Sequence, residues 1–384
     1  MEHLISKVVA RAGRTRTETS EKGRRKATAR RLLAVGVGSG GCAAAQWVFE
    51  DTPEASTLSL NTDRVSLELH KCERQMLLGE RIFGGKSAQG HAEAARRAAR
   101  ESEEALGDLL EGFDIVVVMA ALGGGTGTGV APVVAAKARA KGAAVVIVAA
   151  LPLRAERRRR ERALAALPEL KREAHTTILL DSEALLPIAG HLPMATALGV
   201  MDYFMAEVPR ALVRAVELAE EREVAERQAR ELVLGGGLGT LVYGEWAHDG
   251  ALPQAQHALV EAAGGSPNAA LVHFHSSDGR APVGSHLVVG EIARRLKSKQ
   301  PPPHNVRFTV ARDPAILAGG YLVSVVTGIA DPCTGSRDPP GVVIEPSRAV
   351  APPSPVEARE APERQAPERQ APDLPSVGLA PRHP

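Results

Sequence analysis

The sequence predicts an α/β protein with a doubly wound parallel-sheet domain, a long central helix and an α+β domain. Between residues 31 and 195, short apolar runs alternate with helical segments, which is typical of a parallel sheet covered by helices. Glycine-rich turns follow two of these runs, Arg31–Val35 and Ile115–Ala121. A helical apolar pattern then continues to residue 233, and four further strand-like runs come after it.

Length and composition exclude several classes of protein. The chain has 384 residues and is 44% hydrophobic, which is enough for two domains with cores of their own. A formal net charge of +2 predicts no general attraction to nucleic acid. Three scattered cysteines fit neither a disulfide framework nor a zinc site, so we expect a reducing cytoplasm. No apolar run approaches the roughly 20 residues of a transmembrane helix.

The first strand-like run is preceded by a basic segment and followed by a glycine turn. Residues 1–30 are rich in arginine and lysine, and we expect a disordered basic arm. After the strand, Gly36, Gly38 and Gly41 fit the pattern G-x-G-x-x-G, and Asp63 lies about 20 residues further on. This spacing also suits a Rossmann dinucleotide site, so a Rossmann oxidoreductase remains an alternative at this point.

A second and richer glycine turn lies at Leu122–Gly129, between the strand Ile115–Ala121 and a helix with Pro132 in its first turn. It holds five glycines and two threonines. Glycine allows the backbone to approach a ligand closely, and the free N–H groups at a helix start attract anions. We therefore predict a phosphate-binding loop.

Further strands are predicted at Leu58–Asp63, Ala144–Ala150 and Thr176–Asp181, with a helix at Ala92–Leu110. In a parallel sheet, ligands bind at the carboxyl ends of the strands. The side chains expected to gather there are those of Asn61–Asp63, Gly123–Gly129, Glu156 and Asp181–Glu183.

The second half begins with residues 195–233, which contain only Gly199 and Pro209 as helix breakers and predict one helix about 45 Å long. Strands are then expected at Leu238–Tyr243, Ala269–His275, Val306–Val310 and Tyr321–Gly328, and helices at Gln254–Ala263 and Ser285–Leu296.

His273 and His275 lie two apart on a strand face that we expect to be solvated, without a third ligand for a metal. Residues 331–384 hold 13 of the 27 prolines and predict a disordered tail.

Over roughly residues 32–329 the chain resembles the FtsZ/tubulin family of polymerising GTPases, and it resembles bacterial FtsZ most. Gly123–Gly129 reads as the glycine loop of that family, and Val130-Ala131 stands where a Walker A loop needs Lys-Ser or Lys-Thr. Leu78–Ser102 aligns without gaps to the third nucleotide loop of the family. The resemblance implies a GTP-binding domain at 31–195, a central helix with an altered catalytic loop at 196–233, and a C-terminal domain at 234–330.

The resemblance also implies a site for GTP or GDP with Mg²⁺. The first loop would bind the nucleotide at Gly38, Ser39, Gly40 and Gly41, which would lie on the α- and β-phosphates. The second loop would bind it at Gly123, Gly124, Gly125, Thr126, Gly127 and Thr128, with Thr126 and Gly127 holding the γ-phosphate and its Mg²⁺. Asn61 and Asp63 match the Asn-Thr-Asp of the family. Glu156 and Arg160 match the residues that contact ribose and base, and Asp202 matches the carboxylate that accepts guanine N1–H and N2–H₂.

Several positions depart from the family pattern around the base. An alanine replaces an Asn in the first loop, a leucine replaces a stacking Phe, and three other positions differ: Ala43, Gln89, His91, Ser182 and Leu198. The resemblance then implies weaker base stacking, weaker hydrogen bonding and a reduced affinity for GTP.

The catalytic loop departs most. In FtsZ, the subunit above inserts a loop with an Asn and acidic residues into the site below, and these groups orient the attacking water. The matching loop here is Arg222–Arg230, where Ala225 and Gln228 occupy the acidic positions and Glu223 the Asn. Alanine cannot position water, so Glu223 and Glu226 are the remaining candidates.

These features predict an FtsZ-like cytoskeletal protein that assembles head-to-tail with itself or with a true FtsZ, in cell division or cell shape. In a homopolymer its GTP hydrolysis is expected to be slow or absent. The alternative is a nucleotide-bound regulator or scaffold that acts on FtsZ without polymerising. A protein that binds the tail is a further expected partner, with no residues assigned to it.

Overall fold

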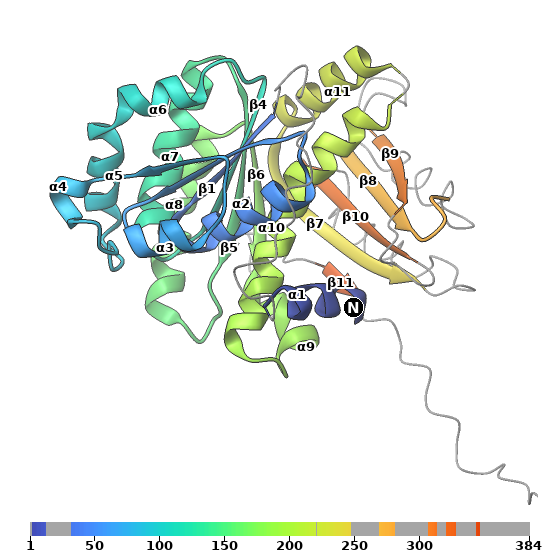
Figure 1. Ribbon diagram of the computed structural model, residues 1–384, viewed down its shortest axis with the longest axis horizontal. Helices are drawn as coiled ribbons and strands as arrows, with labels where there is room; N and C mark the ends of the chain where they lie inside the picture. The colour runs from blue at the N-terminus through green and yellow to red at the C-terminus, as the bar shows by residue number, and fades with distance from the viewer. Residues whose placement is uncertain are drawn as a thin grey trace, which may run out of the picture. The chain divides into compact units, whose positions relative to one another are not determined.

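The computed structural model describes residues 2–12, 32–219, 221–246, 269–280, 306–312, 320–327 and 343–345 (Figure 1). All of them belong to the first of two compact units, Met1–Ser347. The helices of the described part are α1 (Glu2–Ala12), α2 (Gly38–Asp51), α3 (Arg64–Leu69), α4 (Glu80–Phe83), α5 (Ala92–Glu101), α6 (Glu103–Leu110), α7 (Gly125–Ala140), α8 (Arg157–Glu173), the 3₁₀ helix η1 (Ser182–Leu185), α9 (Leu186–Ala189), α10 (Met194–Glu217) and α11 (Arg222–Leu234). Its strands are β1 (Leu32–Val37), β2 (Ser56–Asn61), β3 (Arg74–Leu77), β4 (Ile115–Ala121), β5 (Ala144–Leu151), β6 (Thr176–Asp181), β7 (Gly237–Trp246), β8 (Ala269–Ser276), β9 (Val306–Arg312), β10 (Gly320–Thr327) and β11 (Val343–Glu345).

The strands form one sheet in the order β3-β2-β1-β4-β5-β6-β7-β10-β8-β9, with β11 beside β7. The run from β3 to β7 is parallel. The chain leaves β1 toward β2 on one side and returns at β4 on the other, so the carboxyl ends of β1 and β4 form a switch point of the sheet. Ligands of doubly wound sheets bind at such points.

Two apolar layers cover the parallel part of the sheet, because its strands are buried on both faces. One core contains residues of α5, α7 and α8, and the other contains residues of α2, α10 and α11. Helix α10 contacts both the parallel strands and the C-terminal strands β8, β9 and β10, and in Figure 1 it passes between these two parts. It therefore links the two halves of the sheet mechanically.

The C-terminal strands follow the sequence expectations closely. Strand β10 pairs antiparallel with β7 and β8, and β8 pairs parallel with β9. The helices expected at 254–263 and 285–296 lie outside the described residues. None of the helices in the described ranges is long and apolar enough to span a membrane.

The structure corrects four sequence-based expectations. Residues 2–12 form helix α1 rather than part of a disordered arm, while residues 13–31 lie outside the described part of the chain. The long helix ends at Glu217 and a new one begins at Arg222. The helix expected at Ala92–Leu110 is divided at Ser102, and within the segment expected to be a disordered tail, residues 343–345 form a strand.

Candidate nucleotide-binding site

The two glycine loops meet at the carboxyl ends of β1 and β4, where α2 and α7 begin. Gly38 has a φ of +72°, and a Cβ added to it would lie 3.1 Å from the backbone nitrogen of Gly127. A Cβ on Gly41 would overlap the carbonyl oxygen of Met119. Glycine is therefore required at these positions by close backbone approach, and the loops pack against each other as one unit.

The second loop combines tight packing with one open position. Gly123 has a φ of +85°, and added Cβ atoms at Gly127 and Gly129 would overlap the carbonyl oxygens of Ala121 and Ala92. Gly124, which caps α7, has nothing within 4 Å of its missing Cβ. The side of Gly124 where a Cβ would stand is thus open, at the helix start where an anion would bind.

The threonines of this loop have different partners. The N–H of Gly123 donates to the Thr128 hydroxyl at 2.9 Å, which braces the loop. The hydroxyls of Thr126 and Thr62 share a hydrogen bond of 2.8 Å, and Thr126 is buried. The structure thus joins the second loop to the end of β2, which lies two positions from β4 in the sheet.

Asn61 ends β2 and Asp63 follows it, so both lie at the same end of the sheet as the glycine loops. The Asn61 Oδ1 accepts hydrogen bonds from the N–H groups of Thr62 (2.9 Å) and Asp63 (3.3 Å). Its Nδ2 is buried and has no hydrogen-bond partner among the described residues. A buried unpaired amide costs about 1–3 kcal/mol, so this atom indicates a ligand oxygen that the protein itself does not supply. Asp63 caps α3 by accepting from the Ser66 N–H at 3.1 Å.

The hydroxyl of Ser39 in the first loop is also tied to α3. Ser66 donates a hydrogen bond of 2.8 Å to it. The predicted phosphate residues of the first loop, the polar end of β2 and the start of α3 therefore form one connected cluster.

Arg160 is placed differently from the expectation that it contacts ribose or base. It is buried, donates two hydrogen bonds to Asp181 (2.8 and 2.6 Å) and one to the Pro152 carbonyl (2.6 Å). Glu156 forms an ion pair with Arg159 at the start of α8. The described contacts give Arg160 a bracing role between α8 and β6, and they leave its contact with a nucleotide as a prediction.

Asp202 lies on α10 beside the first glycine loop. A Cβ added to Gly40 would lie 3.5 Å from its Oδ1. Burial raises the pKa of the Asp202 carboxyl to about 8, and the positive charge of Arg11 opposes this rise. A carboxyl in this setting ionises most readily when a ligand offers it hydrogen-bond donors.

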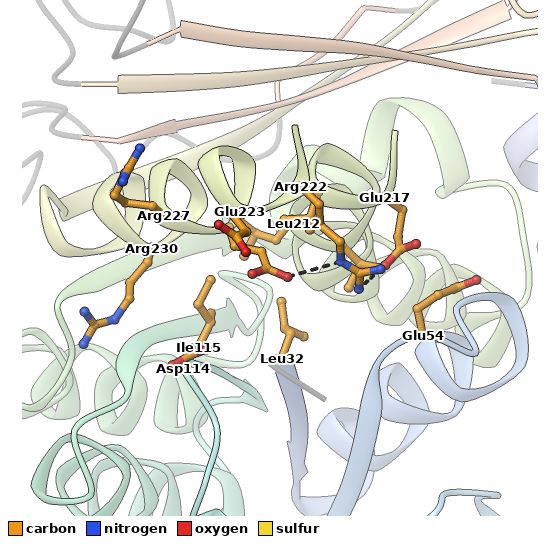
Figure 2. A pocket seen from close by; sticks show the side chains of 13 residues that line it. Leu32, Glu54, Asp114, Ile115, Leu212, Glu217, Arg222, Glu223, Arg227 and Arg230 are labelled. Atoms are coloured by element: carbon orange, nitrogen blue, oxygen red, sulfur yellow. Dashed lines mark hydrogen bonds and ion pairs between the residues drawn. The ribbon is translucent and has the colours of Figure 1, made fainter. Parts of the chain in front are cut away.

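The loop between α10 and α11 lies at the opposite edge, where β1 and β4 begin. It borders a cavity of about 270 Å³, shown in Figure 2. Glu226 is paired with Arg222 at 3.2 Å, whereas Glu223 is exposed in the first turn of α11. Ala225 is 0% exposed, so its methyl group faces the protein interior.

The sequence did not predict two polar features on the side of the sheet that α10 covers. His273 and His275 are both buried rather than solvated, and Arg214 of α10 donates to the His275 ring at 2.9 Å. Arg11 of α1 lies close enough to influence the pKa of Asp202. These residues are distant in sequence, and no local pattern marks their partners.

The sequence is similar to those of known proteins. Residues 31–190 match the Tubulin/FtsZ family, GTPase domain. "Cell division protein FtsZ 2" of Methanocaldococcus jannaschii is 26% identical over 347 residues, which covers 87% of this chain and 88% of that protein. "Cell division protein FtsZ 1" of Archaeoglobus fulgidus is 29% identical over 311 residues, covering 78% and 83%.

Solved structures agree in fold. The empty FtsZ dimer of M. jannaschii superposes with a TM-score of 0.71 at 25% identity, covering 79% of this chain and 89% of that one. The GTPγS-bound protofilament of CetZ2 from Haloferax volcanii gives a TM-score of 0.64 at 19% identity, with 78% and 93% covered.

Proposed function

We propose that this chain, whose residues 31–190 match the Tubulin/FtsZ family, GTPase domain, binds GTP and assembles head-to-tail as a cytoskeletal subunit. The observation that carries the proposal is the pair of interlocked glycine loops at the switch point of the sheet. They leave open space at Gly124 and stand beside the unpaired Nδ2 of Asn61. A role in cell division is proposed from the names of the FtsZ relatives.

The residues present fit a guanine nucleotide with Mg²⁺. The N–H groups of both loops suit phosphate oxygens, and the Asn61 amide supplies one further donor. At nucleotide sites Mg²⁺ is bound mainly by phosphate oxygens and water, with few ligands from the protein. We assign the Thr126 hydroxyl as its protein ligand. Two donors on guanine match the two oxygens of Asp202, whereas adenine would leave them unpaired.

We infer that hydrolysis in a homopolymer is slow or absent. Ala225 faces the interior, and the carboxylate of Glu226 is held by Arg222 of the same chain. Glu223 is the exposed acid in the first turn of α11, and it alone of the three is presented to a neighbouring subunit. Such a chain would accept a catalytic loop from a true FtsZ above it and fail to supply one below. The alternative dinucleotide oxidoreductase is set aside because the matched family is a GTPase family.

The test is GTP turnover against protein concentration, together with GTP-dependent sedimentation. The proposal expects polymer that sediments with GTP, low turnover alone, and higher turnover when the chain is mixed with an active FtsZ. Rapid cooperative turnover of this chain alone would contradict the impaired hydrolysis. Binding of GTP without any sedimenting polymer would instead favour the non-polymerising regulator.

A further inference from the structure

Helix α1 is docked on α2 and α10, the two helices that flank the proposed base site (Figure 1). Val8 is 4% exposed, and a Cβ on Gly199 would lie 3.2 Å from its Cγ1. Lys7 pairs with Asp51 at 3.6 Å. Val8 and Lys7 thus fix the helix to α10 by an apolar contact and to α2 by an ion pair.

Arg11 is the most tightly held side chain of α1. Its guanidinium carbon lies 3.7 Å from the ring centroid of Trp47, and its Nη2 lies 3.1 Å from the Glu50 carboxylate. Its Nη1 is buried and has no hydrogen-bond partner among the described residues. The guanidinium is therefore held rigidly with one end satisfied and the other end lacking an acceptor, which costs free energy until an acceptor arrives.

The Arg11 guanidinium, held over Trp47, belongs to the same side of α2 as the proposed base site. Trp47 follows Ala43 by four residues, so both lie on the same face of α2, about 6 Å apart along the axis. Gly40, one turn before Ala43, contacts Asp202. The positive charge of Arg11 in turn lowers the pKa of Asp202. We call the surface formed by Arg11, Trp47, Ala43, Gly40 and Asp202 the base strip.

This strip lacks a donor that guanine needs. If Asp202 accepts N1–H and N2–H₂, the O6 carbonyl, bonded to the carbon next to N1, points to the adjoining part of the strip. Ala43 and Leu198, on the two flanking helices, carry no polar side-chain atom. Arginine is a favoured partner of guanine O6, because its N–H groups are fixed donors.

We propose that Arg11 Nη1 donates a hydrogen bond to O6 of the bound guanine, so that α1 completes the base pocket and takes part in guanine recognition. The proposal rests on the proposed GTP site. The Arg11 contact extends the proposed GTP site by a residue that determines base specificity, on a helix outside the GTPase domain. It also gives the unpaired Nη1 an acceptor, and it explains how Ala43 is tolerated beside the base.

The experiment compares binding of GTP, 6-thio-GTP and ITP to the full chain, with calorimetry in the absence of polymer. 6-Thio-GTP keeps N1–H and N2–H₂ but replaces O6 with a poor acceptor, whereas ITP keeps O6 and lacks the N2 amino group. Arg11→Met keeps the aliphatic stem over Trp47. Lys7→Met is the matched control, because it removes a cation from the same helix with similar exposure, 25% against 19%.

A charge-assisted hydrogen bond predicts that the wild-type chain binds GTP about 10-fold more tightly than 6-thio-GTP. Arg11→Met is expected to reduce this ratio to about 2-fold or less, because it weakens binding of GTP and not of 6-thio-GTP. The GTP-to-ITP ratio should stay unchanged, because ITP also carries O6 and loses the same hydrogen bond. Lys7→Met is expected to leave both ratios unchanged.

Three results would overturn the inference while leaving the proposed GTP site intact. The first is an unchanged GTP-to-6-thio-GTP ratio in Arg11→Met. The second is an equal loss for both nucleotides in Arg11→Met and Lys7→Met, which would mean that α1 acts only by docking. The third is loss of the ratio in Ser182→Ala instead, which would assign the donor to that hydroxyl. Absence of GTP binding by the wild-type chain would overturn the proposed function itself.

Discussion

Affinity for GTP is expected to rise with pH through the neutral range, because Asp202 must be ionised to accept hydrogen bonds from guanine. Burial raises the pKa of its carboxyl to about 8, and Arg11 opposes the rise. A protonated carboxyl would direct a hydroxyl hydrogen toward guanine donors, so one of the two hydrogen bonds would be lost. The affinity for GTP is therefore limited by the fraction of nucleotide-free protein in which the Asp202 carboxyl is ionised.

The magnitude follows from that pKa. With a value of about 8, the ionised fraction increases from about 3% at pH 6.5 to about 75% at pH 8.5. The apparent dissociation constant is the intrinsic one divided by this fraction, so the Kd for GTP should fall about 25-fold over the interval.

Stability of the empty protein should change in the opposite direction. The folded chain keeps the Asp202 proton up to about pH 8, whereas the unfolded chain loses it near pH 3.8. The unfolded state therefore binds fewer protons within that window, and the contribution of Asp202 to the free energy of unfolding decreases as pH rises through it.

The assay is calorimetric titration of GTP at several pH values into wild-type protein and into Asp202→Asn. The variant has no ionisable group at this position, so its slope reports the titration of the nucleotide phosphates alone. The difference between the two slopes is the Asp202 contribution. Parallel slopes for the two proteins would refute the reasoning, whatever their absolute affinities.

Three further predictions concern the site and its supports. Gly41→Ala should unfold at a lower temperature because its Cβ would overlap the Met119 carbonyl, whereas Gly124→Ala should keep its melting temperature and lose GTP affinity. Calorimetric melting and GTP titration measure both effects, and equal melting temperatures would contradict the first. Asp181→Ala should cost about 3–5 kcal/mol of unfolding free energy in urea titrations by removing the carboxylate that neutralises buried Arg160. Glu156→Ala, near the surface, should cost at most about 1 kcal/mol. Burial lowers the pKa of His273 to about 3, so the unfolded chain binds a proton that the folded chain does not, and stability falls as pH drops from about 6.5 toward 3. His273→Gln should flatten this dependence in urea midpoints measured between pH 7 and pH 4, and an unchanged slope would contradict it.

The parallel sheet and the glycine loops were predictable because their signals are local. The strands at Ile115–Ala121 and Thr176–Asp181 have the bounds expected from their apolar runs. The glycine spacing predicted turns at the ends of β1 and β4, and the structure explains it by backbone contacts that leave no room for a Cβ at Gly41 and Gly127. The apolar runs and the glycine spacing that predicted these features are local, although the contact of Gly41 with Met119 forms only in the folded sheet.

The remaining features depend on partners that are far away in the sequence. Residues 218–221 contain neither glycine nor proline, so the sequence predicted a continuous helix where α10 ends. The break lets α11 turn back onto the sheet, where Thr176 donates to the Val233 carbonyl at 2.6 Å. His275 is satisfied by Arg214, 61 residues earlier, and the pairing of Arg160 with Asp181 also required the folded sheet to be seen.

The segment that the resemblance aligns with the catalytic loop forms the first turns of helix α11. The difference therefore concerns which side chains this helix exposes, as well as which residues are acidic. An ungapped alignment assigns Ala225 to an acidic position, but this residue is 0% exposed, so an acid there would enter the interior instead of reaching a neighbour. Residues two apart on a helix point to nearly opposite sides, which is why Glu223 is exposed while Ala225 is buried. Restoring an acid at Ala225 would therefore destabilise α11 without supplying a group to the next subunit. In the proposed filament, the catalytic group would therefore come from the exposed Glu223 or from a different subunit that provides its own loop.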